Sequence, residues 1–181
     1  MMRREIRIAG FGGQGVITIG LLLAKALGQF GEAAVAQTQS YGPEARGGAC
    51  KTDIVFSDAE IDYIKPLALD CMAVMSQPAL NTYAESLSDA SLLVADATLV
   101  DDIPERFTNV RKIPATALAE ERLGMRVAAN VVIFGALAKA TGWVTVEACK
   151  QALSDTFPEK VLAANHAAFD LGYAEASRGA S

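Results

Sequence analysis

Residues 10–15 read Gly-Phe-Gly-Gly-Gln-Gly, and this short stretch decides the fold that the sequence predicts. It follows the apolar run 6–9 and leads into an apolar segment that begins at Val16. Gly10, Gly12 and Gly15 have the spacing of a dinucleotide-binding turn between a strand and a helix. In such a turn the first glycine bends the chain, the second lets backbone approach a diphosphate, and the third allows close packing. The stretch therefore predicts the start of a βαβ unit.

A helix that begins near this turn directs free N–H groups and the positive end of its dipole toward an anion. The residues expected to make such contacts are Gly12, Gly13, Gln14 and Gly15.

The rest of the chain continues the α/β pattern as far as residue 113. Short β-branched or apolar runs predict strands at residues 5–9, 33–38, 52–56, 71–76, 92–95 and 110–113. Residues 14–30 have helical spacing between the first two strands, and Pro78 can occupy the first turn of a helix between the fourth and fifth. After Pro114 the pattern predicts only helices, at residues 115–123, 127–140, 144–156 and 158–173.

These elements predict a three-layer α/β/α domain, Rossmann-like, with a mainly parallel sheet and a helical final third. The third strand follows the second after only a loop, so part of the sheet is expected to be mixed. Residues 1–174 read as a single domain, with a frayed tail at 175–181. The segment 127–138 is apolar on nearly all sides, so we expect it to be buried in the domain or against another chain.

Composition narrows the class of protein. Of the 181 residues, 51% are hydrophobic, which indicates a large core, and the net charge of −5 disfavours nucleic-acid binding. No uncharged apolar run reaches membrane-spanning length. The three cysteines are far apart and form no C-x-x-C pair, so we interpret them as core residues of a reducing compartment and expect a cytoplasmic protein.

The glycine turn alone does not identify the ligand that would bind there. An NAD enzyme needs an acidic residue at the end of the second strand, but here that strand ends in Gln37-Thr38-Gln39-Ser40, and Glu32 lies at the wrong end. An NAD-dependent dehydrogenase is therefore disfavoured. The remaining readings are a turn that only packs helix on strand, a site for another anionic group, and a surface covered by a partner chain.

A second cluster occupies residues 37–48, at the carboxyl end of the second predicted strand. We expect it to lie close to the glycine turn, because ligands of open α/β sheets bind at that end of the strands. Arg46 brings five N–H donors suited to carboxylate or phosphate, and Gly47-Gly48 lets backbone approach a ligand or another chain. The plain alternative is a surface turn in which Arg46 pairs with Glu44.

Together, Gly-Phe-Gly-Gly-Gln-Gly-Val at 10–16 and Gln-Thr-Gln-Ser-Tyr-Gly-Pro-Glu-Ala-Arg-Gly-Gly at 37–48 resemble the gamma subunits of 2-oxoacid:ferredoxin (acceptor) oxidoreductases. Further similarities lie at 57–61, 76–80, 129–137 and near Asn165, so the resemblance runs from about residue 6 to residue 172. The form of the second cluster is most like the 2-oxoglutarate branch, with pyruvate and branched-chain relatives as alternatives. One departure is that proline follows Tyr63 only at Pro66, whereas the family often places it directly after the tyrosine.

The resemblance implies a subunit of a complex that decarboxylates a 2-oxoacid oxidatively with coenzyme A, thiamine diphosphate, Mg and iron–sulfur clusters. No Gly-Asp-Gly segment and no grouped cysteines occur here, so those cofactors are expected on alpha, beta and ferredoxin-like delta subunits, with ferredoxin as acceptor. We expect the isolated chain to bind none of them firmly. The cofactor-binding or interface residues are then expected to be Gly10, Gly12, Gly13, Gln14, Gly15, Gln39, Tyr41, Arg46, Gly47, Gly48 and Asn130. The rival hypothesis is a stand-alone nucleotide-binding or regulatory module.

Overall fold

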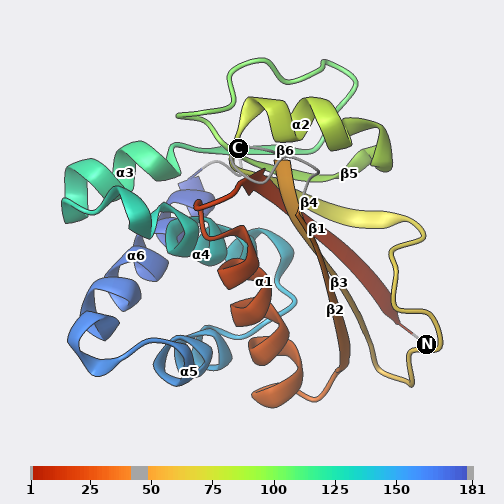
Figure 1. Ribbon diagram of the computed structural model, residues 1–181, viewed down its shortest axis with the longest axis horizontal. Helices are drawn as coiled ribbons and strands as arrows, with labels where there is room; N and C mark the ends of the chain where they lie inside the picture. Colours follow the sequence, from red (N-terminus) through yellow and green to blue (C-terminus); the bar gives the residue numbers. More distant parts are fainter. Residues whose placement is uncertain (1, 42–48, 179–181) are drawn as a thin grey trace.

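The chain folds around a six-stranded mixed sheet with helices on both faces (Figure 1). The computed structural model describes residues 2–41 and 49–178. The strand order is β2-β3-β1-β4-β5-β6; β3 runs antiparallel to β1 and β2, whereas β1, β4, β5 and β6 are parallel. The strands are β1 (Arg3–Phe11), β2 (Ala34–Tyr41), β3 (Ala49–Ser57), β4 (Leu69–Val74), β5 (Leu87–Asp96) and β6 (Val110–Ile113). The predicted α/β class and the expected mixed sheet are confirmed.

The helices are distributed unequally over the two faces. Figure 1 shows α2 on one face of the sheet and α1, α4, α5 and α6 on the other. The α-helices are α1 (Val16–Ala24), α2 (Gln77–Tyr83), α3 (Ala115–Leu123), α4 (Ala129–Thr141), α5 (Val146–Thr156) and α6 (Glu159–Arg178). Shorter turns are the π-helical η1 (Lys25–Gln29) and the 3-10 segments η2 (Ala84–Ser86) and η3 (Arg126–Ala128).

Strand β1 shows how the alternation of side chains divides the core in two. Ile6 and Ile8 point to the face covered by α1 and α4, whereas Ala9 points to the face covered by α2. Because successive side chains of a strand point to opposite faces, one central strand contributes to both cores. The α2 core includes Met72, Leu80 and other apolar residues of β4, β5 and α2.

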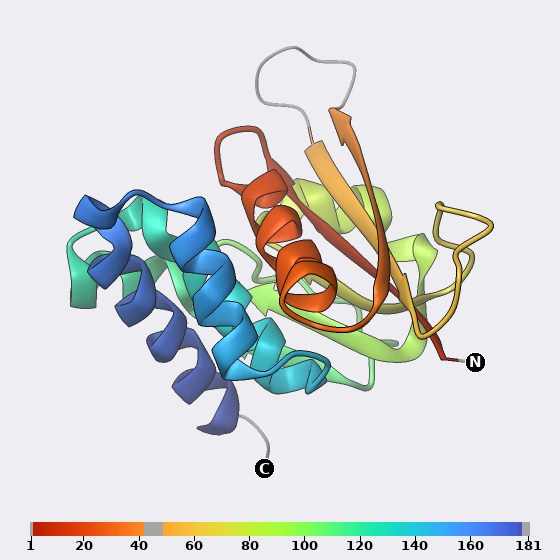
Figure 2. The ribbon, with the colours of Figure 1, turned by 90° about the horizontal axis from the view of Figure 1, so that it is seen from below.

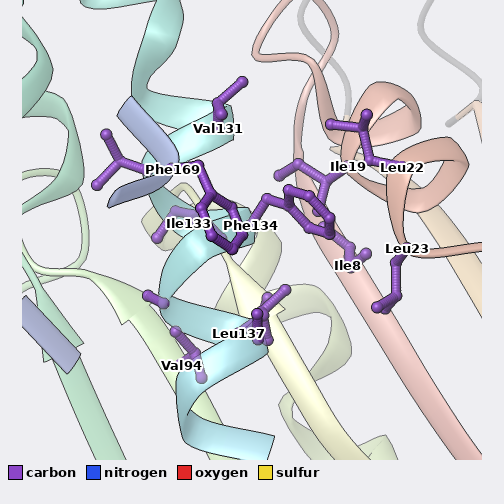
Figure 3. Close-up of a cluster of buried hydrophobic side chains, with 14 of the residues drawn as sticks. Ile8, Ile19, Leu22, Leu23, Val94, Val131, Ile133, Phe134, Leu137 and Phe169 are labelled. Atoms are coloured by element: carbon purple, nitrogen blue, oxygen red, sulfur yellow. The ribbon is translucent and has the colours of Figure 1, made fainter. Parts of the chain in front are cut away.

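Helix α4 forms the centre of the larger core (Figure 3). Every residue from 129 to 138 is buried, and the rings of Phe134 and Phe169 lie 5.5 Å apart, joining α4 to α6. Figure 3 shows Ile8 and Ile19 beside this pair, so the sheet and α1 close the other side. The apolar surface of this segment is therefore buried within the domain and gives no argument for a partner chain. Its predicted first residue, Val127, lies outside the core and is 71% exposed.

Several element boundaries differ from the sequence-based expectation, among them those of α1, β5 and α6. Helix α1 begins at Val16 and not at Gln14, because Gly15, its N-cap, has the left-handed conformation (φ 74°). Strand β5 begins at Leu87, five residues before the predicted apolar run, since its first half carries exposed polar residues. Helix α6 continues to Arg178, past the point where a frayed tail was expected, and buries Ala176. In the described residues, no helix is both long and apolar enough to cross a bilayer.

Two glycines allow α4 and α6 to cross with their backbones in contact. A methyl group on Gly172 would overlap the carbonyl oxygen of Val132, and one on Gly135 would overlap that of Phe169. The buried helix pair thus depends on the absence of two Cβ atoms, because backbone atoms cannot move aside as a flexible side chain can.

We predict that Gly172→Ala lowers the free energy of unfolding by about 2 kcal/mol or more, since the overlap outweighs the better helix propensity of alanine. The matched control is Gly12→Ala, which adds the same methyl group where no atom of the described residues lies within 4 Å. Urea denaturation measures both changes. Equal midpoints for Gly172→Ala and the wild type would contradict the close crossing.

Candidate functional site

The carboxyl ends of β1 and β4 form the point where the chain connections diverge. From β1 the chain passes through α1 to β2 on one side of the sheet, and from β4 it passes through α2 to β5 on the other. Helices α1 and α2 also cover opposite faces (Figure 2). Open α/β sheets bind ligands at such a divergence, outside the carboxyl ends of the strands.

Gln14 fixes the glycine loop (residues 10–15) to this divergence. Its side-chain Oε1 accepts a hydrogen bond from the backbone N–H of Phe11 at 2.6 Å. Its Nε2 donates to the carbonyl oxygen of Met75 at 2.8 Å, and Met75 directly follows β4. A single amide therefore joins the ends of the two adjacent strands. Gln14 was predicted to contact an anion through its backbone N–H; in the structure this N–H donates to the carbonyl oxygen of Phe11 at 3.2 Å.

Gly15 contacts Asn130, which lies in the segment 129–137 where the family resemblance continues. It is the N-cap of α1 in the left-handed conformation (φ 74°), and its missing side chain leaves space for the side chain of Asn130. Asn130 is 8% exposed, and its Oδ1 accepts a hydrogen bond from the backbone N–H of Val131 at 2.9 Å. The structure thus brings two predicted site residues together, with Asn130 in a packing role against the glycine loop.

The other glycines of the loop differ in their surroundings. Gly10 is buried, and a Cβ there would lie 2.6 Å from Oε1 of Gln14 and 3.2 Å from Cβ of Met75. Gly12 and Gly13 are exposed, no atom of the described residues would meet a Cβ at either, and Gly13 has a φ of 93°. No side chain caps the start of α1. The loop therefore has a closely packed base and an open tip, and the tip is where a ligand or a partner can approach.

A hollow of about 270 Å³ lies beside this tip. Its lining is mainly apolar and comes from the loops after β1, β4 and β5 and from the starts of α3 and α4: Gly13, Gln14, Met75, Leu99, Thr116, Arg126, Val127 and Ala129. The Thr116 hydroxyl is not free, because it donates to the carboxylate of buried Asp96, which also accepts from the N–H of Thr98. The same carboxylate accepts from the backbone N–H of Thr116 at 3.2 Å, in the first turn of α3, so Asp96 acts as a buried cap of this helix. Arg126 is the charged side chain at the rim of this hollow.

The second predicted cluster starts from the same edge of the sheet. In the strand register, Gly10 pairs with Cys50 and Cys50 with Tyr41, so β1, β3 and the end of β2 lie in one row. The expected proximity of the two loops is therefore supported by the positions where the second one leaves and rejoins the sheet. Gln39 is exposed on β2. Arg46, Gly47 and Gly48 lie outside the described residues.

A buried group of charges on the α2 face was missed by the sequence analysis. Arg7 on β1 donates to Asp53 on β3 through Nε (2.6 Å) and Nη2 (3.0 Å), and Lys51 Nζ donates to the same carboxylate at 2.9 Å. The Arg7 and Asp53 side chains are 11% and 6% exposed. Arg7 and Asp53 each lie within a strand of mostly apolar residues. Two opposite charges in such strands were the sequence signal that could have predicted this buried ion pair. Leaving either alone would place an unpaired charge in the interior.

These charges line a second hollow, of about 350 Å³, next to the end of β2. Thr38, Gln39 and Ser40 border it, together with Lys65 and Pro66. Tyr83 of α2 covers the group from the side, with the Arg7 guanidinium 5.3 Å from the centre of its ring. Burial raises the pKa of the Tyr83 hydroxyl, while the Arg7 charge opposes this shift. The larger depression beside Phe30 and α5, of about 810 Å³, contains none of the predicted site residues.

The three cysteines occupy separate buried positions on β3, β4 and α5. Burial raises the pKa of the Cys71 and Cys50 thiols, and that of Cys149 to about 12. Thiols of this kind are protonated at neutral pH and act as small apolar side chains. Among the residues that the structure describes, no three His, Cys, Asp or Glu side chains group as metal ligands. The positions of the cysteines do not fit a cysteine-ligated iron–sulfur cluster.

We predict that Gln14→Leu lowers the free energy of unfolding by about 1–3 kcal/mol, because two hydrogen bonds at the base of the loop are lost. Exposed Gln151 on α5 gives the matched control, Gln151→Leu, which should change stability by less than about 0.5 kcal/mol. Chemical denaturation checks both. If Gln14→Leu behaves like the control, the amide does not hold the loop.

The fold and the loop define a doubly wound α/β/α domain that presents a glycine-rich tip at the point where its strand connections diverge. The sequence model of the pyruvate ferredoxin/flavodoxin oxidoreductase family matches residues 5–175. The chain belongs to this family, and the resemblance found in the two glycine-rich loops is confirmed.

Three relatives show how the domain is used elsewhere. The 2-oxoglutarate synthase subunit KorC of Methanothermobacter marburgensis is 45% identical over 177 residues, covering 94% of this chain and 95% of that one. The ketoisovalerate oxidoreductase subunit VorA of Methanothermobacter thermautotrophicus is 29% identical and aligns over 93% of this chain but 35% of its own. The solved gamma subunit of a keto/oxoacid ferredoxin oxidoreductase from Geobacter sulfurreducens superposes with a TM-score of 0.87 and 32% identity, covering 97% of this chain and 99% of that one.

Proposed function

We propose that the chain is the gamma subunit of a 2-oxoglutarate:ferredoxin oxidoreductase. The observation that carries the proposal is the similarity to KorC, a 2-oxoglutarate synthase subunit, over nearly the full length of both chains. The Tyr-Gly-Pro-Glu-Ala-Arg-Gly-Gly form of residues 41–48 supports the same branch. The assembled enzyme would convert 2-oxoglutarate and coenzyme A to the acyl-coenzyme A and carbon dioxide, passing two electrons to ferredoxin.

In this reaction the chain itself would support the complex and contact coenzyme A or a neighbouring subunit. Its buried, separated cysteines do not fit a cluster, and its sequence holds no Gly-Asp-Gly segment for a thiamine diphosphate site. Thiamine diphosphate with Mg and the iron–sulfur clusters would therefore be held by alpha, beta and delta subunits. The rigid base and open tip of the glycine loop fit a surface that shapes the coenzyme A region from the side or contacts a neighbouring subunit.

The order of the strands argues against an NAD-dependent dehydrogenase. In the dinucleotide-binding fold, the strand bearing the ribose-binding acid lies next to the strand before the glycine turn. Here β3 lies between β1 and β2, so the end of β2 is one strand further from the glycine loop. Its terminal residues, Gln39 to Tyr41, also include no acid.

Co-purification under anaerobic conditions tests the proposed function. Tagged chain from its native cells should bring down larger subunits, and the eluate should reduce an artificial electron acceptor with coenzyme A and 2-oxoglutarate faster than with pyruvate or a branched-chain 2-oxoacid. Elution of the chain alone, with nucleotide bound and no such activity, would instead support the stand-alone module. A preference for another 2-oxoacid would keep the family and correct the substrate.

Arg46 is our proposed contact for an anionic group of coenzyme A or of a partner. Arg46→Ala should raise the KM for coenzyme A about tenfold or more in the assembled enzyme, because a charge-assisted contact of roughly 1.5–3 kcal/mol is lost. The control is Arg122→Ala, which removes an exposed arginine of α3. Unchanged coenzyme A affinity and turnover in a fully assembled Arg46→Ala enzyme would refute this role.

A further inference from the structure

The two edges of the sheet differ in the protection that they carry. Edge strand β6 is four residues long and includes Arg111 and Lys112, features that discourage pairing with another strand. Edge strand β2 is eight residues long, reads Ala-Val-Ala-Gln-Thr-Gln-Ser-Tyr, and has neither a charge nor a proline. Natural proteins seldom leave an edge of this kind uncovered, because its free N–H and C=O groups invite a further strand.

The outer edge of β2 is unpaired within the described part of the chain. Its register with β3 is regular from Ala34 opposite Ser57 to Tyr41 opposite Cys50, without a bulge that would twist it away. No other described strand lies beyond it in the sheet (Figure 1). Ala34, Gln39 and Ser40 are exposed. The edge is therefore long, regular and open.

A groove runs beside this edge on the face covered by α1. It has a volume of about 420 Å³, and its lining comes from the end of α1, η1 and β2: Ala24, Lys25, Gly28, Gln29, Ala33, Val35 and Gln37. Val35 and Gln37 point to this face, because they lie opposite Phe56 and Ile54, which belong to the larger core. A strand added next to β2 would direct alternate side chains into the groove.

We propose that β2 pairs antiparallel with β2 of a second copy of this chain, across a two-fold axis perpendicular to the sheet. Such an interface is self-complementary, so the unpaired N–H and C=O groups of each β2 edge bond to those of the other. Because β2 has no charged residue, no cross-strand pair brings like charges together in any register. Val35 and Gln37 of each copy then face the groove of the other, and the two six-stranded sheets become continuous.

Charges placed on the edge test this pairing. Ala34 and Ser40 are exposed on the same face, opposite Ser57 and Lys51 of β3. Centred on Gln37, the pairing places position 34 opposite position 40 of the second copy. Light scattering after size exclusion should give the wild type twice the chain mass of 19.0 kDa. Ala34→Glu/Ser40→Glu and Ala34→Lys/Ser40→Lys should each raise the dimer Kd more than tenfold, and mixing the two variants should restore the dimer.

The matched control is Ser88→Glu/Ala90→Glu, which adds the same charges at exposed positions of β5 and should remain dimeric. Circular dichroism checks folding, and Ala34→Glu alone is the milder variant should a double variant fail to fold. A wild type that is monomeric at all concentrations overturns the proposal. So does a dimer that both charged pairs leave intact, which would lie on another face. If the wild type is monomeric and its edge variants no longer co-purify with larger subunits, the edge binds a different protein.

Discussion

The two hydrogen bonds of the Gln14 side-chain amide determine where the candidate site lies. The amide accepts from the chain leaving β1 and donates to the chain leaving β4, so it holds together two strands whose connections run to opposite sides of the sheet. Helix α1 starts at Val16 because Gly15, its N-cap, is in the left-handed conformation. The hollow beside the tip is lined by both Gln14 and Met75, the two residues that the donated hydrogen bond joins.

The glycines of the loop divide into two functions for a physical reason. Gly10 and Gly15 are required by neighbours, since a side chain would collide with Gln14 at one and Asn130 at the other. No atom of the described residues lies within 4 Å of a Cβ built at Gly12 or Gly13, so within that part of the chain the space in front of them is free. A motif that reads as one nucleotide-binding turn is thus half packing and half open surface. That division suits a subunit that presents backbone to a neighbour or to a cofactor held largely elsewhere.

Much of the fold followed from the sequence because hydrophobic periodicity is a local property. All six strands and the main helices lie where their apolar runs predicted them. The insertion of β3 between β1 and β2 is a long-range pairing that no local pattern encodes. Likewise, the glycine spacing marked Gly15 as a close approach, but only the fold shows that Asn130 fills the space. Arg7 and Asp53 were overlooked because each was considered alone within its own apolar strand.

We propose that the carboxyl edge of the sheet, at the tip of the glycine loop, is covered in the assembled enzyme. Hydrogen–deuterium exchange of the chain, free and within the purified complex, tests it most directly. We expect slower exchange at residues 12–18 in the complex, with no change in the exposed turn after α3 at Gly124. Equal exchange at residues 12–18 in the two states would show that the tip of the loop faces solvent and would contradict this proposal.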